Sequence, residues 1–182
     1  MITPRLSVPA VRPRGLATAL LMLVVAAPVL AAATQLLDSV VARVSGVGIT
    51  PTDVEAALGL GVIAVAAGQD RMAAGTKAMI DRRLLLAEVS RFPPAEPPQA
   101  AILERVAAMK SRAGAGYDAL VRRTGLDDER VREMARDSLR LEAYIAQRFG
   151  TAESAQRRDA LVAQWLADLR MRGDVVEITP RP

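Results

Sequence analysis

The sequence has no cysteine and no histidine among its 182 residues. The absence of cysteine excludes disulfide bonds, thiolate nucleophiles and a lipoprotein anchor on an N-terminal cysteine. The absence of histidine excludes imidazole as a proton shuttle or as a zinc ligand. Most common enzyme classes are thereby excluded, and we expect no catalytic residues, no metal site and no cofactor.

Aromatic residues are also few, with one tryptophan, two tyrosines and two phenylalanines. The 24 basic and 20 acidic residues give a net charge of +4, but three arginines lie in the first 33 residues, which contain no acid. Residues 34–182 therefore carry 21 basic and 20 acidic side chains, a net charge of +1. Nucleic-acid binders typically combine a basic stripe with stacking aromatic side chains, so we expect no nucleic-acid partner.

The first 33 residues have the three parts of a Sec-type signal peptide. Arg5, Arg12 and Arg14 form a basic region, residues 15–30 are apolar, and the alanines at residues 31–33 offer small side chains for cleavage. This pattern predicts export from the cytoplasm.

The same segment is also compatible with an uncleaved membrane anchor, because residues 15–33 carry no charge and approach the roughly 20 residues that span a bilayer. Pro28 and the alanine-rich end favour cleavage. We therefore expect residues 34–182 to form a single periplasmic domain. The alternative is a protein anchored in the inner membrane and facing the periplasm, which is the only case in which we expect membrane contact.

Two short segments near opposite ends of residues 34–182 have β character. Residues 40–44 (VVARV) are rich in β-branched side chains, residues 45–48 (SGVG) can turn the chain, and Ile49 begins a second extended segment. Residues 174–178 (DVVEI) form the other segment. A lone strand leaves its backbone groups unpaired, so we predict that this C-terminal strand pairs with the opening segment.

Between these segments, apolar residues recur at helical spacing and turn residues punctuate the chain. Thr50, Pro51 and Asp53 predict a helix start, and the prolines of residues 93–98 (PPAEPP) predict a stiff connector between helices. The expected fold is mainly α with about six helices and a small β-sheet that pairs the N-terminal hairpin segment with the C-terminal strand. The predicted helices are residues 51 to about 67, 70–92, 99–112, 117–124, 127–149, and a sixth that Thr151 caps and Gly173 ends.

Four stretches, in this order, carry a resemblance to a known family. They are VVARVSGVGITPTDVEAAL (residues 40–58), MIDRRLLLAEVSRF (79–92), residues 117–149 and WLADLRMRGDVVEI (165–178). The chain resembles the N-terminal chaperone domain of SurA-like proteins, the periplasmic chaperones and parvulin-type prolyl isomerases. Ser45 and Gly48 depart from the family's usual turn, and no residues remain for a parvulin domain. We therefore do not expect prolyl isomerase activity.

The resemblance implies a periplasmic chaperone that binds unfolded or outer-membrane client polypeptides. Methionine is an adaptable, polarizable contact residue, and the sixth helix has a strongly apolar face. The candidates for peptide contact are therefore Met79, Met109, Met134 and Trp165. The alternative interpretation is that these side chains fill the core.

Two other classes of function are alternatives to a chaperone. A structural or assembly module would dock one specific partner or form a homodimer by exchanging its C-terminal helix and strand. An enzyme would use carboxylates such as Asp127, Asp128, Glu129 or Glu153, but their places at predicted helix starts favour capping.

Arginine pairs occur three times in the predicted helices, and we interpret them as solvated helix faces. A cluster that binds an acidic ligand is the minor alternative. The pairs are Arg82-Arg83, Arg122-Arg123 and Arg157-Arg158.

Overall fold

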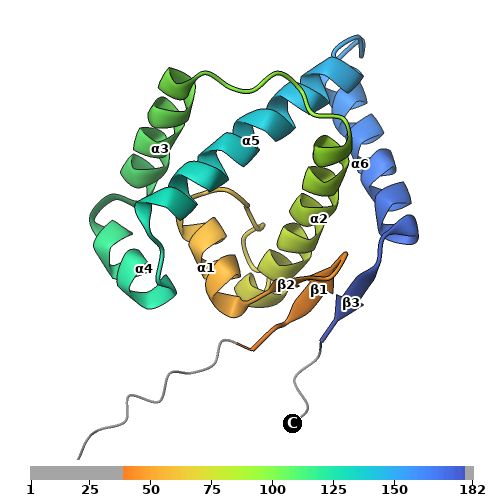
Figure 1. The fold of residues 1–182 in the computed structure, drawn as a ribbon. Helices are drawn as coiled ribbons and strands as arrows, with labels where there is room; N and C mark the ends of the chain where they lie inside the picture. The colour runs from red at the N-terminus through yellow and green to blue at the C-terminus, as the bar shows by residue number, and fades with distance from the viewer. Residues whose placement is uncertain (1–38, 179–182) are drawn as a thin grey trace, which may run out of the picture. The chain divides into compact units, whose positions relative to one another are not determined.

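The computed structural model describes residues 39–178, so the predicted signal segment lies outside the described residues. Within them the chain forms six α-helices, one short 3₁₀-helix and three strands, which confirms the predicted fold class (Figure 1). The elements are β1 (Ala42–Val44), β2 (Val47–Ile49), α1 (Pro51–Gly59), α2 (Arg71–Arg91), α3 (Gln99–Ala113), η1 (Gly114–Gly116), α4 (Tyr117–Thr124), α5 (Asp128–Phe149), α6 (Ala155–Arg172) and β3 (Val175–Glu177).

The three strands form one antiparallel sheet in the order β2-β1-β3. The predicted pairing of the C-terminal strand with the opening segment is confirmed, since Arg43 lies opposite Val176 in the ladder. Backbone hydrogen bonds from Ser45 N to Asp174 O (2.8 Å) and from Ile178 N to Val41 O (2.9 Å) flank this pair. Figure 1 shows the two ends of the described chain side by side at this sheet.

Ser45 and Gly46 form the two-residue turn of the β1-β2 hairpin. Both residues have positive φ, 49° for Ser45 and 83° for Gly46, as a type I′ turn requires. A non-glycine residue with positive φ is uncommon, and asparagine adopts this conformation much more readily than serine. The turn is therefore strained at Ser45.

Replacing Ser45 with asparagine is expected to raise the free energy of unfolding by about 0.5–1 kcal/mol, because the strain at positive φ is relieved. Chemical denaturation followed by circular dichroism measures the change. Ser90→Asn is the matched control, since Ser90 is an exposed helical residue. An equal or larger gain in that control would contradict the assignment of strain to the turn.

Helix α1 begins as predicted and ends earlier than predicted. Thr50 Oγ1 accepts a hydrogen bond from Asp53 N, and Asp53 Oδ2 accepts one from Thr50 N, both at 3.1 Å, which is a complete capping box. The helix ends at Gly59 rather than near residue 67. Gly61 has φ +68°, and Val62 N donates back to Ala57 O, so the chain turns there instead of continuing the helix.

The cap of α6 also differs from the prediction. Ser154, rather than Thr151, is the capping residue, and its hydroxyl accepts a hydrogen bond from Arg157 N at 3.1 Å. Both serine and threonine are preferred capping residues, so the sequence alone did not distinguish these two nearby hydroxyl groups. Asp127, in contrast, caps α5 as predicted, accepting from Arg130 N at 2.7 Å.

Two clusters of buried apolar residues form the core. The first lies between the sheet and helices α1, α2, α5 and α6, and the second between α1, α3, α4 and α5. The largest fully buried side chains are Ile49, Val54 and Val89 in the first cluster and Leu60 and Val131 in the second. Helix α1 contributes to both clusters, and so joins the sheet side of the domain to the α3-α4 side.

The proline-rich connector between α2 and α3 is attached to α5 by a single acidic residue. Glu96 lies 3.1 Å from Nε of Arg136 and 3.9 Å from Nε of Arg140, both on α5. Prolines keep this segment out of helix, and the ion pairs hold it against its neighbour. The connector therefore fixes where α3 begins relative to α5.

Candidate functional site

The most unusual buried residue in the described chain is Arg82, in the middle of α2. Its exposed fraction is 8%, so the prediction that the Arg82-Arg83 pair forms a solvated helix face is wrong for Arg82. The residue lies three positions after Met79 and three before Leu85, both buried, and so shares their face of the helix. The pairs Arg122-Arg123 and Arg157-Arg158 are exposed, as predicted.

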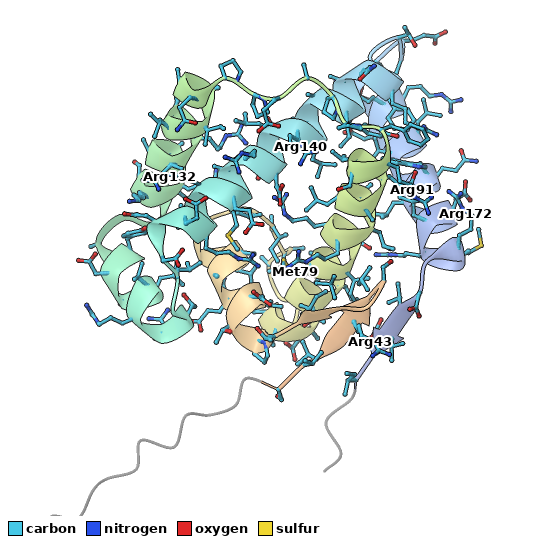
Figure 2. The ribbon with its side chains drawn as sticks, viewed as in Figure 1. Arg43, Met79, Arg91, Arg132, Arg140 and Arg172 are labelled. Atoms are coloured by element: carbon cyan, nitrogen blue, oxygen red, sulfur yellow. The ribbon has the colours of Figure 1, made fainter. Side chains whose placement is uncertain are left out.

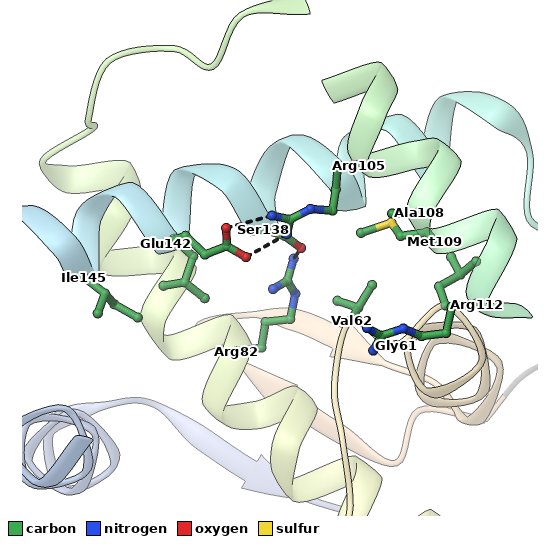
Figure 3. A pocket seen from close by; sticks show the side chains of 12 residues that line it. Gly61, Val62, Arg82, Arg105, Ala108, Met109, Arg112, Ser138, Glu142 and Ile145 are labelled. Atoms are coloured by element: carbon green, nitrogen blue, oxygen red, sulfur yellow. Dashed lines mark hydrogen bonds and ion pairs between the residues drawn. The ribbon is translucent and has the colours of Figure 1, made fainter. Parts of the chain in front are cut away.

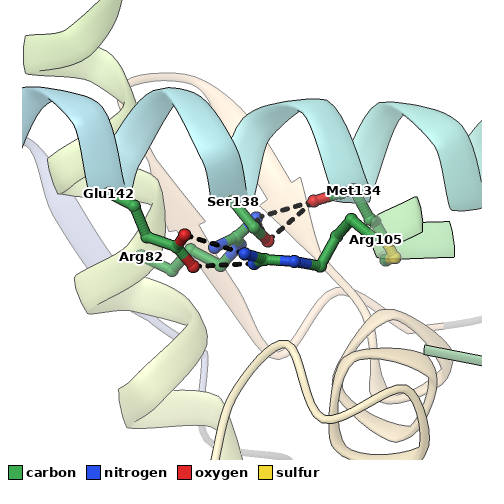
Figure 4. Close-up of polar contacts among 5 residues, drawn as sticks. All are labelled: Arg82, Arg105, Met134, Ser138 and Glu142. Carbon is green, nitrogen blue, oxygen red and sulfur yellow. Dashed lines mark hydrogen bonds and ion pairs between the residues drawn. The ribbon is translucent and has the colours of Figure 1, made fainter. Parts of the chain in front are cut away.

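The Arg82 guanidinium donates only to neutral acceptors on α5. Its Nη2 donates to Met134 O at 3.3 Å and to Ser138 Oγ at 3.1 Å, and Ser138 Oγ itself donates to Met134 O at 2.8 Å (Figure 4). No described carboxylate forms an ion pair with Arg82, and its Nε and Nη1 have no acceptor among the described residues. A buried cation without a directly bonded anion is energetically costly.

A second arginine near this site is already paired. Arg105 of α3 donates to both carboxylate oxygens of Glu142 on α5, at 2.7 and 2.8 Å, in a bidentate ion pair. Figure 3 shows the Arg82 side chain rising from α2 toward this pair. Glu142 thus pairs with Arg105 and leaves Arg82 without a directly bonded anion.

A third arginine, Arg112 of α3, lies against Gly61 in the segment after α1. The side chain of Arg112 covers Gly61 so closely that a Cβ at Gly61 would overlap Cδ of Arg112. Arg112 is exposed and forms no ion pair with any described residue. Glycine at position 61 therefore allows the positive φ of the chain turn and leaves room for the Arg112 side chain.

These three arginines line one pocket of about 480 Å³. The segment after α1 and helices α2, α3 and α5 form its walls (Figure 3). Glu142 is the only acidic side chain of the lining, which leaves two positive charges in excess. The same pocket has an apolar part formed by Leu60, Val62, Met109, Leu141 and Ile145. An amphiphilic ligand with one anionic end fits this combination of side chains.

The charges around Arg82 act on it at longer range. Burial lowers the pKa of Arg82, and Asp137 and Glu142 counter this by raising that pKa electrostatically. Burial also raises the pKa of Asp137, which the positive charge of Arg82 opposes. Asp137 therefore supports the Arg82 charge through space, without a hydrogen bond to it.

The pair of Arg105 and Glu142 predicts a pH dependence of stability. The hydrogen bond from Arg105 is the main cause that lowers the pKa of Glu142 below its ordinary value. A carboxyl with a lowered pKa in the folded state stabilises the fold above its ordinary pKa, and this contribution is lost as the pH falls through the lowered value.

We therefore expect Glu142→Gln to cost up to about 1 kcal/mol at pH 7, a small effect because the Glu142 side chain is 59% exposed. The difference between the two proteins should shrink as the pH falls below about 4. Urea unfolding at pH 3, 5 and 7 measures it. Glu129→Gln serves as the control, with the side chain 74% exposed and a longer contact of 3.5 Å to Arg132. A difference that grows at low pH would contradict the assignment.

The four predicted peptide-contact residues are all buried, and they do not form one common site. Met79 and Trp165 belong to the first core cluster, and Met109 and Met134 to the second. Their exposed fractions lie between 4% and 7%. Figure 2 shows Met79 in the interior, whereas Arg172 lies at the periphery. Met109 lines the arginine pocket, and Met79 and Met134 line a separate cavity of about 30 Å³, which is too small for a peptide side chain. Peptide contact by these residues stays a prediction.

Three of the four acidic residues singled out from the sequence have structural partners, and Glu153 is exposed with no bonded partner among the described residues. Asp127 caps α5, Asp128 binds Lys110 at 2.8 Å and Glu129 contacts Arg132. Residues 39–178 contain no group of three acidic side chains arranged to hold a metal ion. Among those residues, no helix combines the length and apolar character needed to cross a membrane.

Comparison with known proteins finds no matching protein family, no matching curated protein and no matching solved structure.

Proposed function

We propose that this chain is an exported, chaperone-like protein that binds unfolded or extended polypeptide segments and catalyses no reaction. The observation that carries the proposal is the amphiphilic pocket between α2, α3 and α5, where unpaired arginines lie beside an apolar wall. Polypeptides offer both kinds of partner, since carboxylates pair with arginine and aliphatic side chains fill apolar space.

The side chains around the pocket favour binding over catalysis. Its lining contains no lysine, tyrosine or aspartate, and its one carboxylate, Glu142, is bonded to Arg105 through both oxygens. A general base needs a free acceptor within reach of a substrate proton, which this arrangement does not provide. Ser138 donates its hydroxyl proton to Met134 O and has no base beside it.

A second, more open depression supports the same proposal. It has a volume of about 690 Å³ and lies between the end of α2 and α5, with Phe92, Tyr144 and Arg148 in its lining. Phe92 has an exposed fraction of 67% and lies just before the proline-rich connector. An exposed aromatic beside arginines is a surface that binds apolar and aromatic polypeptide side chains. We place this activity in the periplasm on the strength of the signal segment predicted from the sequence.

The experiment is an aggregation assay with residues 34–182, the expected mature chain, added to several unrelated chemically unfolded proteins. We expect light scattering to rise more slowly for each of them, without ATP. A prolyl isomerisation assay on a tetrapeptide is run in parallel, and no acceleration is expected.

Three results would contradict the proposal. Unchanged aggregation of all the client proteins would exclude a chaperone, and stoichiometric capture of one partner alone would indicate an assembly module. Accelerated isomerisation would exclude a purely binding role. The Phe92→Ser variant provides an internal check, since we expect weaker protection with an unchanged fold because Phe92 is exposed.

A further inference from the structure

The arginine pocket contains a charge that the described residues leave without a directly bonded partner. Arg82 is more than nine-tenths buried, yet only its Nη2 is hydrogen bonded and both acceptors are neutral. Nε and Nη1 have no acceptor among residues 39–178. Neither atom is completely buried, so both have some access to solvent. These two atoms therefore remain open to a ligand beside the pocket that Arg82 lines.

We infer that this pocket binds the C-terminal carboxylate of an extended polypeptide, and that Arg82 is the residue that pairs with it; the inference rests on the proposed function. Nη1 lies on the Cδ side of the guanidinium, away from the Nε hydrogen, so one carboxylate cannot bond to both atoms. A carboxylate oxygen that accepts from Nη1 forms one charge-assisted hydrogen bond and gives Arg82 the directly bonded anion that it lacks.

The rest of the lining fits a carboxylate on an apolar body better than an inorganic anion. Met109, Leu141 and Ile145 contribute apolar surface to the same pocket, which an aliphatic terminal side chain can cover. A free phosphate would leave this surface exposed to water. Arg112, the unpaired arginine of α3, adds a second positive charge that attracts the chain end.

The arrangement of the pocket's walls favours a chain end over an acidic side chain inside a polypeptide. Four segments form its walls, namely residues 60–62 and helices α2, α3 and α5. A terminal residue enters such a pocket with the chain leaving on one side only. An internal glutamate brings chain on both sides and cannot place its carboxylate as deeply.

The test is fluorescence anisotropy of the purified full chain with an N-terminally labelled eight-residue peptide that ends in leucine. Three forms are compared: the free acid, the C-terminal amide, and the amide with an internal glutamate. We expect the acid to bind about tenfold or more tightly than either amide, because a charge-assisted hydrogen bond and the attraction of unlike charges are lost in both. Acetyl-leucine should compete with the acid, and inorganic phosphate at the same concentration should not.

Arg82→Met removes the charge and retains an unbranched side chain of similar length. We expect the variant to bind acid and amide equally. Arg122→Met is the matched control, since it removes the same charge from an exposed residue of α4 outside the pocket, and its acid preference should equal that of the unaltered chain.

Circular dichroism first establishes that Arg82→Met folds. If it does not fold, the Arg112→Met variant, which alters an exposed side chain, is tested instead. We expect its affinity for the acid peptide to fall about threefold or more. Unchanged affinity overturns the inference.

Equal binding of acid and amide by the unaltered chain overturns the inference, as does an acid preference that survives in Arg82→Met. Tight binding of the internal-glutamate amide overturns the chain-end assignment, and competition by phosphate overturns the choice of a carboxylate. Slowed client aggregation together with equal binding of acid and amide leaves the proposed function standing while the inference fails. Unslowed client aggregation together with equal binding of acid and amide contradicts both the proposed function and the inference.

Discussion

Replacing Trp165 with alanine is expected to lower the free energy of unfolding by about 3–5 kcal/mol, the range for deleting a large buried aromatic side chain. Trp165 has an exposed fraction of 7% and joins α6 to α5. Its ring stacks on Tyr144, with centroids 5.7 Å apart and an interplanar angle of 24°. Phe149 packs against it at 5.6 Å, and the Arg148 guanidinium lies 5.1 Å from the ring centroid.

The measurement is urea unfolding followed by far-ultraviolet circular dichroism, because the variant loses the only tryptophan of the chain. Met171→Ala is the control on the same helix, and its change should stay within about 0.5 kcal/mol because Met171 is 78% exposed. A stable Trp165→Ala protein with impaired client binding would contradict the structural role. It would instead support the peptide contact predicted from the sequence.

Ending the chain at Gly173 is expected to lower the free energy of unfolding by about 2–4 kcal/mol. The shortened chain lacks β3, so β1 changes from the central strand of the sheet to an edge strand. The ladder bonds of Ser45 with Asp174 and of Val41 with Ile178 are lost, together with those of Arg43 opposite Val176, at about 0.5–1.5 kcal/mol each. Val175 also no longer packs against the first core cluster.

The matched control ends at Ile178 and retains the whole of β3. Hydrogen exchange measures the local effect, since the amide of Ser45 should lose its protection only in the shorter chain. Equal unfolding free energies for the two truncated chains would contradict the view that β3 closes the domain.

The sheet could be predicted, although its strands lie far apart in the chain, because few segments could form it. Only residues 40–49 and 174–178 have β character, and backbone groups of a lone strand require a partner. Helix starts at Thr50 and Asp127 followed from side chains that lie within three residues of the groups they bond. The early end of α1 was missed although its signal is local, because Gly61, with φ +68°, follows the cap residue Leu60 and stops the helix there.

The pocket could not be predicted from the sequence. The burial of Arg82 depends on acceptors of Met134 and Ser138, which are 52 and 56 residues away. A local signal was nevertheless present, because Gly75, Met79 and Arg82 have the three- and four-residue spacing of a buried helix face. The signal was missed because Arg82 and Arg83 were interpreted together as a solvated pair. A charged residue at a core spacing is the pattern to examine in other helical sequences.

The central claim is that this domain distinguishes unfolded polypeptide from folded protein, and a direct binding measurement tests it. A fluorescently labelled, disulfide-bonded protein is titrated with residues 34–182 in its native form and again after reduction and carboxymethylation, which hold it unfolded. The account predicts saturable binding of the unfolded form, with no binding of the native form. Absence of binding to the unfolded form, or equal binding to both, would contradict it.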